Sequence, residues 1–370
     1  MKKIIALLLM AAMVLSLAAC SGNTAPAATE APAEAPAEAE APAAEEPAEA
    51  PAEEPAAEPA AAGEYKLGMG IVLNMDSSAA GNAQVDATVA TVVTDAEGKI
   101  VMARIDAVQD KMDVTDGEVD TEKTFETKAE LKDRYNMVAY SDATLEWYEQ
   151  AQGFEAYVVG KTAAEVEGTE TTINEEGYHV AVDEELFASC SISIEDFIAA
   201  VVKACNDEQG QTFAASGDFT LGVAAISSAD ESTPATEDED GVVKMYSAYG
   251  AAVVGADGVI IAALNDATQP NVSIDIDGEI TDTSFRGTKR ELMEDYNMVA
   301  YSDAISEWYV QSKAFSDWAA GQTAAELRGT ETTTNEEGYQ VAVDETLFAS
   351  VTIAITDMVE VVARAADYAR

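Results

Sequence analysis

The feature that most constrains this chain is an internal duplication. Residues Tyr135–Ser189 recur, with most positions unchanged, as Tyr296–Ser350. The segment Tyr135–Ala143 is repeated letter for letter as Tyr296–Ala304, and the copies stay 161 residues apart throughout this block. A period of this length describes a domain rather than a short solenoid repeat. We therefore expect two versions of one domain, joined in a single chain.

Length and charge narrow the possible partners. The chain has 370 residues, which suits two domains and a tail. Its 69 acidic and 20 basic residues give a net charge of -49, so nucleic acids and anionic lipid surfaces would be repelled. It contains only three cysteines and one histidine, too few for most zinc, iron–sulfur and Cys/His catalytic sites. Nucleic acid is therefore not an expected partner.

The N-terminus has the pattern of a secretory signal. Lys2 and Lys3 precede the apolar run Ile4–Ala19, which is short for a permanent membrane span. The run leads into Leu17–Cys20, which resembles the lipobox of bacterial lipoproteins. That resemblance implies cleavage before Cys20 and a lipid on Cys20, so that the mature chain is anchored to the membrane on the extracytoplasmic face of the cell envelope. The alternative is an ordinary signal peptide with a cysteine there by chance.

Composition also divides the chain into segments. Residues 21–63 are almost wholly Ala, Pro and Glu, which predicts a disordered tether, because this composition cannot form a core and its prolines favour an extended path. We assign residues 1–20 to the signal peptide and lipobox, 21–63 to the tether, 64–206 to repeat domain 1, 207–217 to a linker and 218–370 to repeat domain 2.

Each repeat begins with strand patterns and continues with helical ones. Val85–Thr94 alternates apolar and polar residues, as a strand with one buried face does, and Ile100–Ile105 completes a hairpin. Helical patterns follow at 128–137, 143–158 and 194–205, with Ser141 and its neighbour Asp142 as the expected N-cap of the second. This order predicts an α+β fold of two homologous domains, each an antiparallel sheet with helices packed on it.

Few residues suggest catalytic or metal chemistry. The single histidine, His179, is Gln340 in the second copy, so it cannot be a general base common to both. Asp275–Gly278 has part of a calcium loop, but Ser284 stands where a bidentate Glu is needed, and a turn is expected instead. Cys190 and Cys205 are expected to be buried free thiols, with a disulfide between them as the alternative. We expect neither a metal site nor an enzyme, and a hydrolase using carboxylates brought together by the fold ranks third among the functions considered.

A repeated group of aromatic residues is the best candidate for a binding site. Aromatic rings with a polar end suit stacking on a planar ligand or a sugar. The same residues at helical spacing are also what a helix buries in a core, and both interpretations stay open. The group comprises Tyr135, Tyr140, Trp147 and Tyr148 in the first copy, and Tyr296, Tyr301, Trp308 and Tyr309 in the second.

The end of each repeat suggests a second candidate site. The first repeat has a hairpin of the form Thr-x-Val…Asp-x-x-Gly-Lys-Ile near its start, and it closes with Ala188–Ser193 followed by the helical stretch Phe197–Val201. This arrangement resembles the FMN-binding domain family of bacterial envelope proteins, whose Ser-Gly-Ala-Thr motif is similar to Ala188–Ser193. The resemblance implies covalent attachment of FMN, through its phosphate, at Ser191 and Thr352.

The function expected from the sequence rests on this resemblance and on the lipobox. The motif's glycine, which would let a phosphate approach the backbone closely, is Ser189 in one copy and Ser350 in the other. The leading expectation is a membrane-anchored extracytoplasmic ligand-binding lipoprotein whose ligand is FMN or another planar small molecule, with electron transfer in the envelope as the consequence. The alternative is a structural or adhesive cell-surface protein without cofactor. The sequence does not give the oligomeric state.

Overall fold

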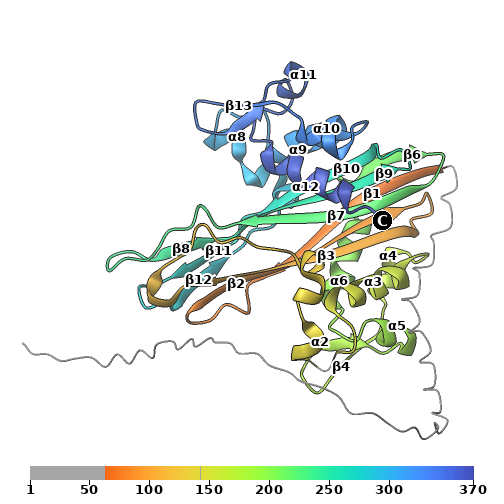
Figure 1. Cartoon of the computed structure of the whole chain (residues 1–370), viewed down its shortest axis with the longest axis horizontal. Coiled ribbons are helices and arrows are strands. Elements are labelled where there is room, and N and C mark those ends of the chain that lie inside the picture. The colour runs from red at the N-terminus through yellow and green to blue at the C-terminus, as the bar shows by residue number, and fades with distance from the viewer. Residues whose placement is uncertain (1–62, 142) are drawn as a thin grey trace, which may run out of the picture. The chain divides into compact units, whose positions relative to one another are not determined.

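The computed structural model describes residues 63–141 and 143–370. The signal peptide, Cys20, the tether up to residue 62 and Asp142 lie outside the described residues. The described chain forms antiparallel sheets, with helices concentrated after β3 and after β12 (Figure 1). The predicted α+β class is confirmed.

The first repeat contains a four-stranded antiparallel sheet in the order β3-β2-β1-β6. Its edge strand β6 comes from the segment expected to be a linker, and it pairs with the start of β1. The strands are β1 (Gly63–Asn74), β2 (Asn82–Thr94), β3 (Ile100–Asp113), β4 (Thr171–Ile173), β5 (His179–Ala181) and β6 (Gln211–Ala215). The helices are η1 (Thr115–Gly117), α1 (Lys128–Leu131), η2 (Lys132–Arg134), α2 (Met137–Tyr140), α3 (Trp147–Val158), α4 (Ala163–Glu167), α5 (Glu184–Ser189) and α6 (Glu195–Cys205).

The second repeat divides its strands between two three-stranded sheets, β10-β9-β7 and β12-β11-β8. Pro270 lies between β10 and β11, and it cannot donate a ladder hydrogen bond. The strands are β7 (Phe219–Ser228), β8 (Gly241–Lys244), β9 (Tyr246–Gly255), β10 (Ile260–Thr268), β11 (Asn271–Ile274), β12 (Ile280–Ser284), β13 (Thr332–Thr334) and β14 (Gln340–Ala342). The helices are α7 (Lys289–Leu292), η3 (Met293–Tyr296), α8 (Met298–Tyr301), α9 (Trp308–Ala319), α10 (Ala324–Arg328), α11 (Glu345–Phe348) and α12 (Thr356–Asp367).

Two expected helices begin or break at places other than those predicted. The helix expected at 128–137 is interrupted because Lys132 and Asn136 have positive φ angles, 47° and 61°. The helix expected from residue 143 begins at Trp147, where Glu146 is the N-cap and forms a capping box with Glu149. Ser141 instead donates its hydroxyl to the carbonyl of Met137 and ends α2. Thr162 and Glu165 have the Thr-x-x-Glu spacing that predicts a capping box, and the structure contains that capping box at the start of α4.

The central strands are buried on both faces, whereas the alternation in Val85–Thr94 predicted one buried face. In β2, Val89 and Val93 face the second repeat, and Ala90 and Val92 face the helices of their own repeat. Thr91 is polar but fully buried, which explains why the sequence pattern resembled a half-exposed strand. The strand thus lies in the middle of three layers.

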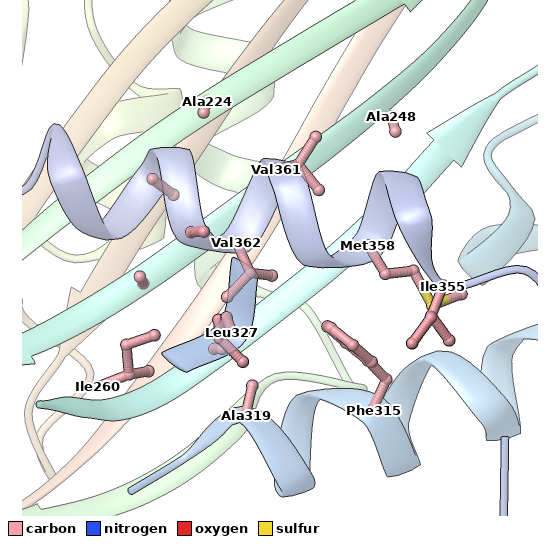
Figure 2. Close-up of a cluster of buried hydrophobic side chains, with 14 of the residues drawn as sticks. Ala224, Ala248, Ile260, Phe315, Ala319, Leu327, Ile355, Met358, Val361 and Val362 are labelled. Atoms are coloured by element: carbon pink, nitrogen blue, oxygen red, sulfur yellow. The ribbon is translucent and has the colours of Figure 1, made fainter. Parts of the chain in front are cut away.

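Glycines on the strands bring the last helix of each repeat close to its sheet. A Cβ atom at Gly68 would lie 2.0 Å from the carbonyl oxygen of Ala204 in α6, and one at Gly222 would lie 1.8 Å from that of Ala365 in α12. Only glycine permits this approach. Figure 2 shows the resulting core in the second repeat, where Phe315 of α9 points toward Ile355 and Met358 beside the strands.

The other face of each sheet packs against the other repeat. Leu67, Met69 and Val89 of the first repeat form one hydrophobic cluster with Leu221 and Tyr249 of the second. All five are at least nine-tenths buried, and both repeats fall in one compact unit. The structure therefore does not separate the repeats into two independently packed domains.

A charged contact between the repeats has no equivalent in the second copy. Glu155 of α3 is 4% exposed, accepts a hydrogen bond from the amide of Ile105, and pairs with the Arg370 guanidinium at 2.7 Å. The corresponding residue of α9 is Ser316, whose hydroxyl accepts a hydrogen bond from the Asn265 side chain within its own repeat. The two copies have thus diverged where they meet.

Candidate functional site

The predicted aromatic groups surround a lysine side chain in each repeat. In the first, Lys128 Nζ lies 5.1 Å from the ring centre of Tyr135 and 5.6 Å from that of Trp147. These distances are typical of cation–π contacts. The capping box of Thr127 and Glu130 sets the start of α1, so that its first residue, Lys128, reaches the first residue of α3.

The second repeat encloses its lysine more completely. Lys289 Nζ lies 5.0 Å from the ring centre of Tyr246, 5.2 Å from that of Tyr296 and 5.3 Å from that of Trp308. Lys289 is only 7% exposed, and burial lowers its pKa to about 8 although Asp266 and Asp357 oppose that shift. The ring faces expected to stack on a ligand are therefore covered by the protein's own cation.

Of the remaining predicted tyrosines, Tyr140 and Tyr301 lie on the surface, while Tyr148 and Tyr309 are half-buried and donate their hydroxyls to Asp133 and Glu294. Tyr140 and Tyr301 are each 85% exposed, at the ends of α2 and α8. Both helices follow an asparagine in the left-handed conformation, and the amides at their starts donate to a carboxylate, Met137 to Glu146 and Met298 to Glu307, both at 2.7 Å. The aromatic group predicted from the sequence is thus divided between an interior contact and exposed rings.

The predicted attachment residues, Ser191 and Thr352, are held by buried glutamines. The backbone amide of Ser191 donates to Gln150 Oε1 at 2.8 Å, and its hydroxyl donates to the same oxygen at 3.2 Å. Thr352 makes the same two bonds to Gln311, at 2.8 and 3.4 Å. Both glutamines are fully buried. These contacts tie α3 and α9 to the segments before α6 and α12.

These surroundings do not fit a phosphate ester as they stand. The Ser189 and Ser350 hydroxyls, which replace the motif's glycine, donate to the carbonyls of Leu186 and Leu347. Neither attachment residue lines the two surface cavities described below. FMN attachment at these positions stays a prediction from the sequence.

The other residues singled out from the sequence have structural partners or are isolated. Cys190 and Cys205 are free thiols, and burial raises the pKa of Cys190 to about 12. His179 Nδ1 lies 3.2 Å from a carboxylate oxygen of Glu195 at the surface.

The Asp275–Gly278 segment forms an ordinary turn, in which the Asp275 carboxylate accepts hydrogen bonds from the amides of Asp277 and Glu279. Within residues 63–141 and 143–370, no three His, Cys, Asp or Glu side chains are grouped closely enough to hold a metal ion.

One surface cavity adjoins the lysine contact of the second repeat. It has a volume of about 260 Å³, and Tyr246 is one of its walls. Gln269, another wall, accepts a hydrogen bond from the Tyr296 hydroxyl at 3.0 Å. At the edge of this cavity, Lys244 Nζ lies 3.6 Å from a carboxylate oxygen of Glu231. In the first repeat, the corresponding Gln109 likewise accepts a hydrogen bond from the Tyr135 hydroxyl, at 3.3 Å, and its side-chain amide donates to Asp86 at 3.0 Å.

A larger, shallow cavity of about 520 Å³ lies in the first repeat, between the β4–β5 hairpin and α5. Val180 and Ala181 lie at its floor, while Val182 and Phe187 are 48% and 44% exposed. We call it the Phe187 surface, and it is lined by Thr172, Asn174, Val180, Ala181, Val182, Glu184 and Phe187.

All seven lining residues recur in the second repeat. We call this copy the Phe348 surface: Thr333, Asn335, Val341, Ala342, Val343, Glu345 and Phe348. Val343 and Phe348 are 46% and 42% exposed, close to their counterparts. Asn174 and Asn335 accept the same hairpin amides at the same distances, 2.8 and 3.1 Å. Sequence reasoning missed these surfaces, although the repeat itself, which includes Leu186–Ser189, was the signal.

Comparison with known proteins adds no relatives: no protein-family model, curated protein or solved structure matches the chain. No helix among the described residues is long and apolar enough to cross a membrane.

Proposed function

We propose that the protein is a lipid-anchored, extracytoplasmic binding protein that presents two copies of one binding surface. The observation that carries this proposal is the identity of all seven lining residues between the Phe187 and Phe348 surfaces. Val182 and Phe187 are large apolar side chains left open to solvent, and the same is true of Val343 and Phe348. Apolar patches kept on a surface are typical of binding sites.

Nearby buried positions have changed between the copies, which makes this identity informative. Glu155 corresponds to Ser316, Val158 to Ala319 and Cys190 to Val351, and all six residues are buried. Buried positions are usually the ones that packing restricts, while exposed positions tolerate substitution at little cost in stability. Stability alone would therefore preserve the interior before the exposed valines and phenylalanines. These three buried positions have changed while the exposed Val182 and Phe187 have kept their identity, as expected when a partner restricts the surface; other buried residues, such as Phe154 and Leu186, are also unchanged.

The proposed location is supported by the lipobox and the composition of the segment after it. A lipid on Cys20 and the Ala/Pro/Glu-rich segment up to residue 63 would hold the two repeats at a distance from the membrane in the cell envelope. Such a position suits a protein that captures or adheres to another envelope component.

Binding to isolated envelopes of the source cell tests the proposal. We expect saturable binding of the purified chain that weakens at least about tenfold when Phe187→Ser and Phe348→Ser are combined. Ile276→Ser is the matched control, because Ile276 is 43% exposed and lies outside both surfaces. Binding that is absent, or equally strong in the double variant and the control, would overturn the proposal.

Flavin attachment has a separate test, on which the binding function does not depend. The protein isolated from its native envelope would be examined by absorption spectroscopy and intact mass. Flavin absorbance and a mass increase that both disappear in Ser191→Ala with Thr352→Ala would establish a flavin carrier. Colourless protein of unmodified mass would leave the binding function without cofactor.

A further inference from the structure

Acidic side chains surround the two repeated surfaces. Residues 168–189 include six acidic residues and no lysine or arginine, and residues 329–350 include five acidic residues and again no lysine or arginine. Every one of these carboxylates belongs to an exposed residue: Glu170, Glu175, Glu176, Asp183, Glu184 and Glu185 in the first repeat, and Glu331, Glu336, Glu337, Asp344 and Glu345 in the second. Each apolar surface thus lies within a negative field.

Building on the proposed function, we infer that the Phe187 and Phe348 surfaces each dock a cationic amphipathic polypeptide segment. Apolar side chains of the segment would lie on Val182 and Phe187, above Val180 and Ala181. Its lysines or arginines would meet the carboxylates at the rim, of which Glu184 directly lines the cavity. Complementary charge brings such a segment to the surface and excludes anionic partners.

The dimensions of the cavity agree with this occupant. A volume of about 520 Å³ holds a few side chains rather than a whole folded partner. The cavity is open and shallow, and the exposed β4–β5 hairpin forms one side of it. A short segment bearing one or two apolar anchors would fill it. Because the lining recurs in the second repeat, one molecule binds two segments.

The apolar contact is the discriminating part of the inference. A protein with a net charge of -49 attracts every polycation to some degree, and that attraction fades as salt rises. Contact with Phe187 and Val182 is largely insensitive to salt, since it comes from burial of apolar area. Specific docking therefore depends on both the charge and the apolar side chains of the segment.

The test is a calorimetric titration of the full chain with a synthetic peptide that alternates lysine and phenylalanine. Two comparison peptides have serine in place of phenylalanine, or glutamate in place of lysine. We expect two equivalent sites for the lysine–phenylalanine peptide at 0.15 M salt, at least about tenfold weaker binding of the lysine–serine peptide, and no binding of the glutamate peptide.

Single variants assign the sites. Phe187→Ser should reduce the stoichiometry from two to one, and adding Phe348→Ser should abolish specific binding, while Ile276→Ser leaves it unchanged. Glu184→Gln with Glu345→Gln should weaken binding several-fold at low salt and less at high salt. Glu237→Gln with Glu239→Gln removes the same charge from an exposed loop outside both surfaces and serves as its control.

Failure of the inference and failure of the proposed function give different results. Equal affinity for the two lysine peptides, unaffected by Phe187→Ser, would show nonspecific attraction and overturn the inference. If the cationic peptide does not depend on Phe187 but envelope binding does, the surface binds another class of ligand, such as a neutral glycan, and only the inference falls. If neither depends on Phe187 and Phe348, both fall.

Discussion

Arg364 of the second repeat donates a hydrogen bond to the carboxylate of Glu130 in the first repeat, at 2.9 Å. Lys203 of the first repeat forms an ion pair with the carboxylate of Glu291 in the second repeat, at 2.5 Å. Glu130 and Glu291 are equivalent residues in the two copies, as are Lys203 and Arg364, since each pair is 161 residues apart. The same contact is therefore made twice, in opposite directions. This is the arrangement of an isologous, twofold interface, found here within one chain.

The Glu130–Arg364 contact should contribute to stability because it is partly buried. Arg364 is 29% exposed and Glu130 15%, and the Tyr368 hydroxyl donates to the same carboxylate. We expect Arg364→Met to lower the free energy of unfolding by about 1–3 kcal/mol, measured by urea denaturation. Arg134→Met removes an exposed pair with Glu126 and should change it by less than about 0.5 kcal/mol. Equal effects of the two substitutions would contradict the prediction.

The shared hydrophobic cluster predicts that the two repeats unfold together. Leu67→Ala, in β1 of the first repeat, should cost about 2–5 kcal/mol, because Leu67 is fully buried. Tryptophan fluorescence would follow the unfolding of each repeat separately in two variants. One variant keeps only Trp147, in the first repeat, and the other keeps only Trp308 and Trp318, in the second. Both signals should shift to the same lower urea midpoint. A shift confined to Trp147 would show that the repeats unfold independently.

Asp110 should make the protein less stable as pH rises. Burial, together with the nearby charge of Asp86, raises its pKa from 3.8 to about 7. The hydroxyls of Ser227 and Ser247 lower the pKa of Asp110 by a smaller amount. These two hydroxyls are also hydrogen-bonded to each other. Because the folded-state pKa is above the unfolded one, the protonated form is favoured on folding, and stability falls between about pH 4 and pH 7. Asp110→Asn should therefore stabilise the protein by roughly 1–4 kcal/mol at pH 8.

The control for Asp110 is Asp238→Asn, which changes an exposed carboxylate in a loop. Thermal unfolding measured from pH 4 to pH 8 should show a shallower pH dependence for Asp110→Asn, and the wild-type profile for Asp238→Asn. Some slope should remain in the first variant, because burial also raises the pKa of Asp106 to about 7 and that of Asp266 to about 6. An Asp110→Asn profile parallel to wild type would refute the prediction.

Lys289 should titrate near pH 8, well below an ordinary lysine. Its position among Tyr246, Tyr296 and Trp308 removes it from water, and the aromatic faces and Asp266 only partly replace the lost solvation. Side-chain nitrogen NMR should show one lysine signal with a midpoint of about 8, absent in Lys289→Arg. If every lysine titrates above pH 10, the burial of Lys289 is wrong.

Cys20→Ser should release the protein from the membrane. In the proposed lipoprotein Cys20 carries the lipid, and without it neither a second lipid nor a basic patch is expected to retain so acidic a chain. Fractionation should move the protein from the membrane pellet to the soluble or secreted fraction. Membrane retention of Cys20→Ser would indicate another anchor.

Local signals in the sequence were sufficient for much of the fold. The β2–β3 hairpin, the capping box at Thr162 and the closing helix up to Cys205 depend on residues a few positions apart, and all three are present. Contacts over long sequence distances were not visible. Nothing near Lys128 in the sequence indicates that it would meet Trp147, and the pairing of β6 with β1 joins residues almost 150 positions apart.

The site was harder to predict than the fold for a related reason. The aromatic pattern identified Trp147 and Trp308 as candidate ligand-binding residues, but their rings are buried against lysines. Helical spacing alone does not say whether an aromatic ring faces a ligand or the core. The Phe187 surface needed the hairpin and α5 to be placed side by side before Val182 and Phe187 could be seen as one cavity. The burial of both faces of β2 was likewise not predictable from its own residues, because the second repeat covers one of these faces.

The twofold contact between the repeats also determines how the protein behaves on dilution. A homodimer held by the same contacts would dissociate at low concentration, because its stability depends on the concentration of its protomers. Here Glu130 and Arg364 belong to one chain, so the contact between them does not depend on the concentration of the protein. A single copy of the protein therefore keeps both of its repeated surfaces.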